Sequence, residues 1–155
     1  MHTISPIINE QLKALCEGDL PAVTLLSNAS ALLMEGVSGL NWAGFYLSKG
    51  ETLYLGPFQG KVACMVIPYG KGVCDTAAIT DTVQRVDDVH TFPGHIACDS
   101  ASNSELVIPM HDKTGKVIGV LDLDSTHFSR FSPDDQKILE EFVSILTSAL
   151  PEITL

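Results

Sequence analysis

Hydrophobic residues near the start of the chain recur at the spacing of an amphipathic helix. One face of residues 21–34 carries most of the apolar side chains, which are Leu25, Leu26, Ala29, Leu32 and Leu33. Residues 9–17 show a similar spacing. We therefore predict that two helices open the chain.

The C-terminal end carries a helix start signal of its own. Ser132 is a good N-cap residue, Pro133 suits the first helical position, and the acidic residues 134–135 suit the positive end of the helix dipole. We predict a closing helix that runs to about residue 150.

Between these helices the apolar residues come in short runs that are separated by turn residues, which is typical of strands. The runs that we predict as strands are residues 41–47, 52–58, 62–68, 83–86, 105–110 and 116–123. The small residues of 73–80 predict a short helix, and residues 87–103 lack periodicity and predict a long functional loop. This order of predicted helices and strands along the chain indicates an α+β fold in one domain over residues 1–155, with a central antiparallel sheet flanked by the N- and C-terminal helices.

Composition narrows the class of protein. Hydrophobic residues make up 45% of the chain and charged residues 18%, values typical of a folded globular protein. The N-terminus lacks a basic segment followed by an apolar one, and no apolar run reaches the roughly 18 residues that span a bilayer. We expect a soluble, cytoplasmic protein with no membrane partner.

The formal net charge of -10 argues against a nucleic-acid partner, because phosphate binding needs clustered Lys and Arg. The same charge would favour a small cation, such as the ammonium of an amino acid, in a cleft.

The four cysteines need a role other than a structural disulfide framework, since we expect no export. Cys16 lies in a predicted helix and is interpreted as a buried small hydrophobe. Cys64, Cys74 and Cys98 lie in or beside the irregular central region, next to small residues that would let another group approach the sulfur.

A zinc site is an alternative for these cysteines. His90, His95 and Cys98 are close in sequence, and Cys64 or Cys74 could complete four ligands. The gaps between the cysteines are long and no second ligand pair is present, so thiol chemistry is the preferred interpretation and no metal is expected.

The positions of three acidic residues indicate that they share one pocket. Asp122 and Asp124 fall on the same side of one predicted strand, and Glu105 begins the strand expected to pair with it. Desolvation and crowding of like charges would raise their pKa values and keep one acid protonated at neutral pH. A strand end in solvent, or a Ca²⁺ or Mg²⁺ site, is equally compatible with these residues alone.

Aromatic residues on the strand at 41–47 suggest a wall for that pocket. Strand alternation places Trp42 and Tyr46 on one face and Phe45 on the other. Aromatic residues on strands are usually core, but one side could enclose a small apolar group such as a methyl.

Several segments together resemble one known family. They read NWAGFYL from Asn41, LGPFQG from Leu55, GKGVC from Gly70, DVHTFPGHIACDSASNSE from Asp88 and GVLDLDS from Gly119. This pattern is similar to that of the free methionine-(R)-sulfoxide reductases, which are single GAF-like domains that need no metal or organic cofactor. The resemblance covers nearly the whole chain.

The resemblance implies roles for the cysteines. Cys98 would be the nucleophile that takes the sulfoxide oxygen, and Cys64 would resolve the sulfenic acid as a disulfide. Cys74 would be an auxiliary or second resolving thiol. Thioredoxin would be the external reductant, and the preference for the R sulfoxide rests on the resemblance alone.

The resemblance also implies substrate contacts. Glu105 and Asp124 would bind and polarise the sulfoxide, and Asp122 would hold the substrate ammonium, although these carboxylate roles could be exchanged. Trp42 and Tyr46 would enclose the methyl-bearing end. An acidic pocket that needs an ammonium would reject a methionine sulfoxide within a polypeptide, whose nitrogen is an amide.

The sequence departs from the family pattern at Asp75, where a glycine usually follows the cysteine. An acid beside a thiol raises the thiol pKa, so we expect Cys74 to be less reactive than Cys98.

Two other functions are compatible with the fold. A GAF module that senses a small molecule without catalysis is the main alternative, and a homodimer formed through the terminal helices is compatible with either function.

Overall fold

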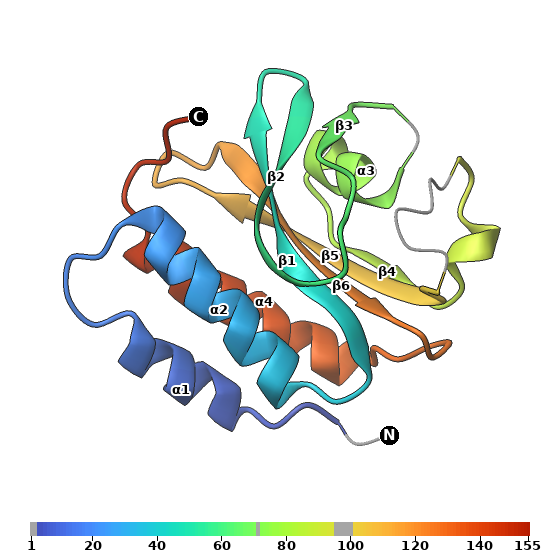
Figure 1. Cartoon of the computed structure of the whole chain (residues 1–155), viewed down its shortest axis with the longest axis horizontal. Coiled ribbons are helices and arrows are strands. Elements are labelled where there is room, and N and C mark those ends of the chain that lie inside the picture. Colours follow the sequence, from blue (N-terminus) through green and yellow to red (C-terminus); the bar gives the residue numbers. More distant parts are fainter. Residues whose placement is uncertain (1–2, 71, 95–100) are drawn as a thin grey trace.

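The sheet at the centre of the protein contains every strand of the described chain (Figure 1). The computed structural model describes residues 3–70, 72–94 and 101–155. The helices are α1 (Ile7–Leu15), α2 (Ala22–Gly36), α3 (Val73–Thr80) and α4 (Pro133–Ala149), with a short 3₁₀ helix at Val89–Thr91. The strands are β1 (Leu40–Lys49), β2 (Thr52–Gly60), β3 (Val66–Pro68), β4 (Gln84–Val86), β5 (Ser104–His111) and β6 (Val117–Ser125).

The six strands lie in the order β3-β2-β1-β6-β5-β4, and all neighbours are antiparallel. β1 and β6 are therefore the central pair, although they come from opposite halves of the sequence. This arrangement is the predicted α+β fold with a central antiparallel sheet, which is confirmed.

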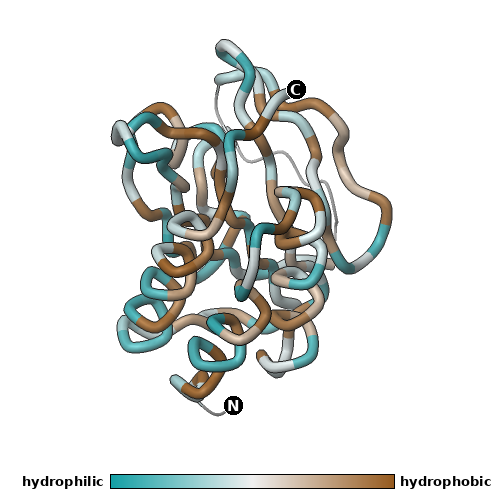
Figure 2. Tube along the Cα trace, turned by 90° about the vertical axis from the view of Figure 1, so that its left-hand side faces the viewer, coloured by the Kyte–Doolittle hydropathy of each residue, from teal (hydrophilic) through white to brown (hydrophobic). Residues whose placement is uncertain are grey.

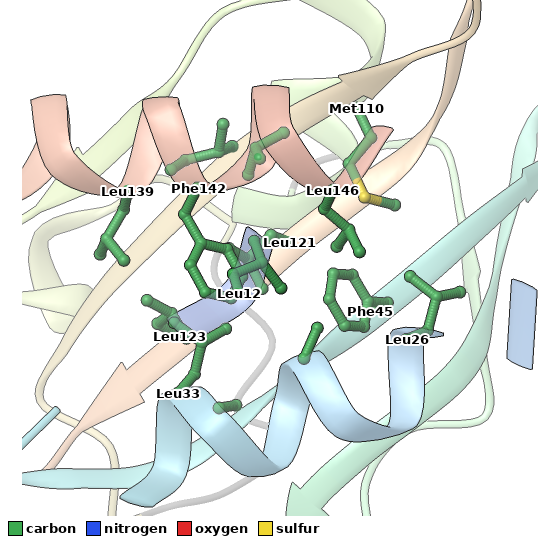
Figure 3. Packing of buried hydrophobic residues seen from close by; sticks show 14 of the residues in the cluster. Leu12, Leu26, Leu33, Phe45, Met110, Leu121, Leu123, Leu139, Phe142 and Leu146 are labelled. Atoms are coloured by element: carbon green, nitrogen blue, oxygen red, sulfur yellow. The ribbon is translucent and has the colours of Figure 1, made fainter. Parts of the chain in front are cut away.

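One face of the sheet carries the main core. Figure 1 shows α1, α2 and α4 together on this side, and Figure 2 shows hydrophilic and hydrophobic residues alternating along the helical turns. Phe45 and Leu121 of the central strands pack with Phe142 and Leu146 of α4 and with Leu26 of α2 (Figure 3). This cluster contains more buried side chains than the cluster on the opposite face, so its burial contributes the larger share of hydrophobic stabilisation.

The start of α4 is fixed by polar contacts. The Ser132 side chain accepts from the Asp135 backbone N–H at 3.0 Å, and Asp135 accepts in return from the Ser132 N–H at 3.1 Å. Asp135 also pairs with the buried Arg130 at 3.2 Å and accepts from the Ile4 N–H at 2.8 Å. The predicted N-cap is confirmed, and it also ties the N-terminal segment to α4.

The opposite face of the sheet holds α3 and the segment between β2 and α3. A smaller apolar cluster lies here, formed by Trp42, Tyr46, Leu53, Val73, Cys74, Ala77, Ala78, Val107 and Val120. Trp42 and Tyr46 thus share a face and Phe45 lies on the other, as strand alternation predicted. Cys16 is half-buried against the main core on the far side of the sheet, with a free thiol.

The prediction of a strand over residues 62–68 was wrong in its first half, because only Val66–Pro68 forms β3. The carbonyls of Lys61 and Cys64 accept hydrogen bonds from side chains of β1 instead of entering a strand ladder.

Within the described ranges, no helix is both long enough and apolar enough to cross a membrane.

Candidate active site

A pocket opens on the face of the sheet that carries α3. Its walls come from β1, β5, β6, the first turn of α3 and the segment between β2 and α3. The lining residues are Trp42, Tyr46, Val62, Ala63, Cys64, Val66, Ile67, Pro68, Gly72, Val73, Cys74, Asp75, Ser102, Glu105, Asp122 and Asp124. It spans about 770 Å³ when the space at its open mouth is included. All described residues that the sequence nominated for the site therefore lie around one pocket.

Sheet register brings the three carboxylates together. Glu105 of β5 pairs with Asp124 of β6, and Asp124 in turn pairs with Trp42 of β1. Asp122 lies two residues before Asp124, so its side chain points to the same face. The prediction that three carboxylates share one pocket is confirmed.

The pocket environment raises the pKa values of two of its acidic residues. Burial raises the pKa of Glu105 well above its ordinary value, and the neighbouring Asp122 and Asp124 raise it further. Burial also raises the pKa of Asp122, although interactions with Glu105 and Cys74 oppose this shift. The predicted direction of these pKa shifts is confirmed, and Glu105 can hold a proton under conditions in which an exposed glutamate is ionised.

One carboxylate oxygen in this group has no hydrogen bond. Asp122 Oδ1 is buried and has no partner in the described part of the chain. A buried acceptor without a donor costs about 1–3 kcal/mol. A ligand that carries a positive charge or an N–H donor would recover this cost.

Cys74 lies against the carboxylates on the first turn of α3. Its Sγ is 3.9 Å from Glu105 Oε2, and the side chain is buried. Burial raises the pKa of the Cys74 thiol, followed by the charges of Asp122 and Glu105. A thiol in this environment is a poor nucleophile at neutral pH.

Burial and the charges of Asp122 and Glu105 are the largest causes of the raised pKa of Cys74, ahead of any effect of Asp75. Its side chain turns away to accept from the Gly70 N–H at 2.7 Å. The other oxygen, Oδ1, is buried without a partner in the described residues, at 2.5 Å from where a Cβ on Gly72 would lie. Asp75 therefore fastens the chain before α3 to the first turn of that helix, a role that the sequence did not reveal.

Trp42 and Tyr46 form a stacked pair in the pocket wall. Their ring centroids are 5.8 Å apart, and Phe58 stacks on Trp42 at 5.2 Å. Phe58 was missed from the sequence. The sequence does contain an indication of this contact, because Phe58 pairs with Gly44 across the β1–β2 hairpin. Glycine has no side chain, so the Phe58 ring has room there.

The polar atoms of the same two side chains hold the segment that carries Cys64. Trp42 Nε1 donates to the Lys61 carbonyl at 3.2 Å, and the Tyr46 hydroxyl donates to the Cys64 carbonyl at 3.0 Å. Burial raises the pKa of Tyr46, so its hydroxyl remains a neutral donor. The aromatic pair thus both lines the pocket and positions Cys64.

The cysteines and histidines of the predicted site are not all described. Cys64 is disulfide-bonded, whereas Cys74 is a free thiol. Cys98 and His95 lie outside the described residues, so the role predicted for Cys98 stays a prediction.

His90 is exposed and pairs with Asp88 at 2.7 Å. Among the described residues, the group with the geometry of a metal site is Cys74, Glu105 and Asp122, and it contains no histidine.

Comparison with known proteins decides the family. The GAF domain family matches residues 2–150. The chain is 52% identical to the free methionine-R-sulfoxide reductase of Escherichia coli, over 92% of this chain and 86% of that protein. The chain belongs to the free methionine-R-sulfoxide reductase family. Both the family and the GAF fold predicted from the sequence are confirmed.

Solved structures of this family share the whole architecture. The free methionine-R-sulfoxide reductase of Neisseria meningitidis, solved in complex with its substrate, superposes with a TM-score of 0.87 at 40% identity, over 92% of this chain and 85% of that one. A putative GAF sensor protein from Burkholderia vietnamiensis is 45% identical, with a TM-score of 0.89 over 93% of this chain and 91% of that one. Fold and overall identity alone therefore do not separate a reductase from a sensor, and the chemistry of the pocket must do so.

Proposed function

We propose that this protein is an oxidoreductase that reduces free L-methionine-(R)-S-oxide to L-methionine. The observation that carries the proposal is the cluster of Glu105, Asp122 and Asp124 in one buried pocket, beside two cysteines and an aromatic pair. The family relationship supports the same reaction.

The carboxylates activate the substrate rather than the thiol. Glu105, with its raised pKa, holds a proton and donates it in a hydrogen bond to the sulfoxide oxygen, and Asp124 helps to orient that oxygen. Hydrogen bonding makes the oxygen easier to transfer when a thiolate attacks. Cys98 is the proposed nucleophile. It takes the oxygen as a sulfenic acid, and the substrate sulfur leaves as the thioether of methionine.

Cys64 completes the redox cycle. Its thiol attacks the sulfenic sulfur of Cys98, a disulfide forms, and the oxygen leaves as water. The disulfide bond of Cys64 and the free thiol of Cys74 support Cys64 as the resolving residue. Thioredoxin, a dithiol, then reduces the disulfide by exchange, so the protein needs no bound cofactor. Cys74 is an auxiliary or second resolving thiol.

Asp122 selects the free amino acid. Its unpartnered Oδ1 accepts from the substrate ammonium, and Trp42 and Tyr46 enclose the methyl end. A methionine sulfoxide within a polypeptide has an amide in place of that ammonium, so it leaves Asp122 without its cation. We place the reaction in the cytoplasm, where thioredoxin keeps thiols reduced.

The test is thioredoxin-coupled oxidation of NADPH by the full chain. Free methionine-R-sulfoxide, free methionine-S-sulfoxide and a peptide that contains methionine sulfoxide are compared as substrates. The variants are Cys98→Ser and, as a matched control, Cys16→Ser, because Cys16 lies on the far side of the sheet.

Turnover of the free R form alone, lost in Cys98→Ser and kept in Cys16→Ser, is the expected result. Turnover that survives in Cys98→Ser would overturn the assignment of the nucleophile. Absence of turnover with every substrate, from folded and reduced protein, would favour a ligand-sensing GAF module.

A further inference from the structure

The side chains of the buried acidic pocket are also suited to bind a ligand other than an amino acid. We propose that Cys74, Glu105 and Asp122 form an inhibitory binding site for a thiophilic divalent cation, with Zn²⁺ as the natural candidate. One ligand atom from each of these residues lies within 4.8 Å of the other two. The binding itself is independent of the proposed function, and only its inhibitory consequence rests on that function.

The spacing fits a tetrahedral metal after small adjustments. Zinc binds sulfur at about 2.3 Å and carboxylate oxygen at about 2.0 Å, which places the two donors roughly 3.5 Å apart. Cys74 Sγ and Glu105 Oε2 are already 3.9 Å apart. Asp124 lines the same pocket, so a fourth ligand is available from its carboxylate or from water.

An independent observation also points to a cation. Asp122 belongs to this group, and its Oδ1 is buried without a hydrogen-bond partner in the described chain. The described residues that line the pocket include four acids and no Lys, Arg or His. A cation that enters the pocket would therefore meet acidic side chains and no basic side chain among the described lining residues.

The thiol determines which cation binds. Ca²⁺ and Mg²⁺ prefer oxygen ligands alone, whereas a thiolate with carboxylates suits Zn²⁺ and similar metals. Cys74 must bind as the thiolate, so coordination releases its proton to solvent. The exposed His90–Asp88 pair lies outside this pocket and offers no thiol.

Occupation of this site would inhibit the enzyme. The metal would engage Glu105, which is proposed to polarise the sulfoxide, and Asp122, which is proposed to hold the ammonium. Substrate and metal would then compete for the same carboxylates. A zinc-loaded protein would bind free methionine sulfoxide only after the metal had left.

The test measures metal binding in a protein that lacks the redox pair. The full-length Cys64→Ser/Cys98→Ser protein, kept reduced, retains only the thiols of Cys16 and Cys74. Co²⁺ is added alone, and the near-ultraviolet absorption of a thiolate–cobalt bond is followed. Zn²⁺ is then added to displace the cobalt. Further variants in this background are Cys74→Ser, Glu105→Gln, Asp122→Asn and, as the matched control, Cys16→Ser. Circular dichroism establishes that each is folded.

One cobalt per chain, displaced by zinc, is the expected result. The absorption should disappear in Cys74→Ser, affinity should fall at least tenfold in Glu105→Gln and Asp122→Asn, and Cys16→Ser should bind unchanged. Binding that persists in Cys74→Ser or disappears in Cys16→Ser would overturn the proposal. In active wild-type protein, Zn²⁺ should raise the apparent KM for free methionine sulfoxide. A protein without reductase activity that still binds cobalt through Cys74 would refute the proposed function alone.

Discussion

Glu105 and Asp124 are direct cross-strand partners in the lining of the pocket, on the adjacent strands β5 and β6. Two like charges in this position repel each other, and burial makes the repulsion stronger. Protonation of one carboxyl removes the repulsion and creates a hydrogen-bond donor. The sheet register therefore produces an acid of the kind that sulfoxide activation needs.

Glu105→Gln should change how stability depends on pH. The pKa of Glu105 is raised in the folded protein, whereas the unfolded chain has a value of about 4.3. Above that value the folded state binds more protons than the unfolded state, so the free energy of unfolding falls as pH rises toward the folded pKa. Glutamine has no proton to lose.

Urea unfolding measured from about pH 5 to about pH 8 should therefore give a shallower decline for Glu105→Gln than for wild type. Glu10→Gln is the control, because that side chain is exposed on α1. An equal or steeper decline in Glu105→Gln would contradict the assignment of a raised pKa.

Cys74 should react more slowly than Cys98 with an alkylating agent. Burial and the charges of Asp122 and Glu105 raise the pKa of Cys74, so little thiolate is present at neutral pH. The reduced protein is treated with limiting iodoacetamide, and the labelled peptides are identified by mass. Modification of Cys74 before Cys98 would show that this prediction is wrong.

Asp75→Gly should destabilise the protein and loosen the pocket wall before α3. The charged hydrogen bond to the Gly70 N–H would be lost, at a cost of about 1.5–3 kcal/mol. Asp75→Asn keeps a side-chain acceptor and should cost less. Urea midpoints distinguish the three proteins. A glycine variant more stable than wild type would mean that burial of the carboxylate costs more than this bond contributes.

Tyr46→Phe should loosen the segment that carries Cys64 while the aromatic stack remains. The variant removes only the hydroxyl that donates to the Cys64 carbonyl, so a loss of about 1 kcal/mol is expected. Amide exchange at residues 62–65 should become faster, and the disulfide should form more slowly after one turnover. Tyr69→Phe is a matched control, because its hydroxyl contacts Ser48 instead. Equal effects in both variants would argue against a specific role for Tyr46.

Gly44→Ala should displace the side chain of Trp42. A Cβ at this position would lie 2.3 Å from Phe58 Cβ and 2.8 Å from Trp42 Cη2, which is closer than packed atoms allow. We expect destabilisation by about 1–3 kcal/mol and weaker substrate binding. Trp42 is the single tryptophan, so intrinsic fluorescence reports its environment directly. Gly70→Ala, with no neighbouring atom nearer than 3.9 Å, should leave the emission unchanged.

Residue types and their spacing predicted the elements that depend on interactions between residues close together in the sequence. The helix over Val73–Thr80 and the cap at Ser132 follow from residue type and spacing, and both match the structure. Strand alternation placed Asp122, Asp124 and Glu105 on one face, because the side-chain period of a strand is fixed.

The contacts that sequence patterns missed join residues distant in the chain or depend on a side-chain rotamer. The Tyr46 hydroxyl donates to the Cys64 carbonyl in a segment that was predicted as strand, and no periodicity encodes this contact. Asp75 was expected to act on its neighbour Cys74, but its carboxylate points toward Gly70. The roles of Cys98 and of thioredoxin, and the homodimer, stay predictions.

The central sheet separates two sets of structural demands. Phe45 and Leu121 on its helical face are held by close packing, whereas Trp42 and Asp122 on the same strands face the pocket. Adjacent positions along one strand therefore meet different requirements, one set by packing of the helical core and one by the chemistry of the pocket. A lineage could exchange the residues of the pocket face and acquire a new ligand while it inherits the helical core intact.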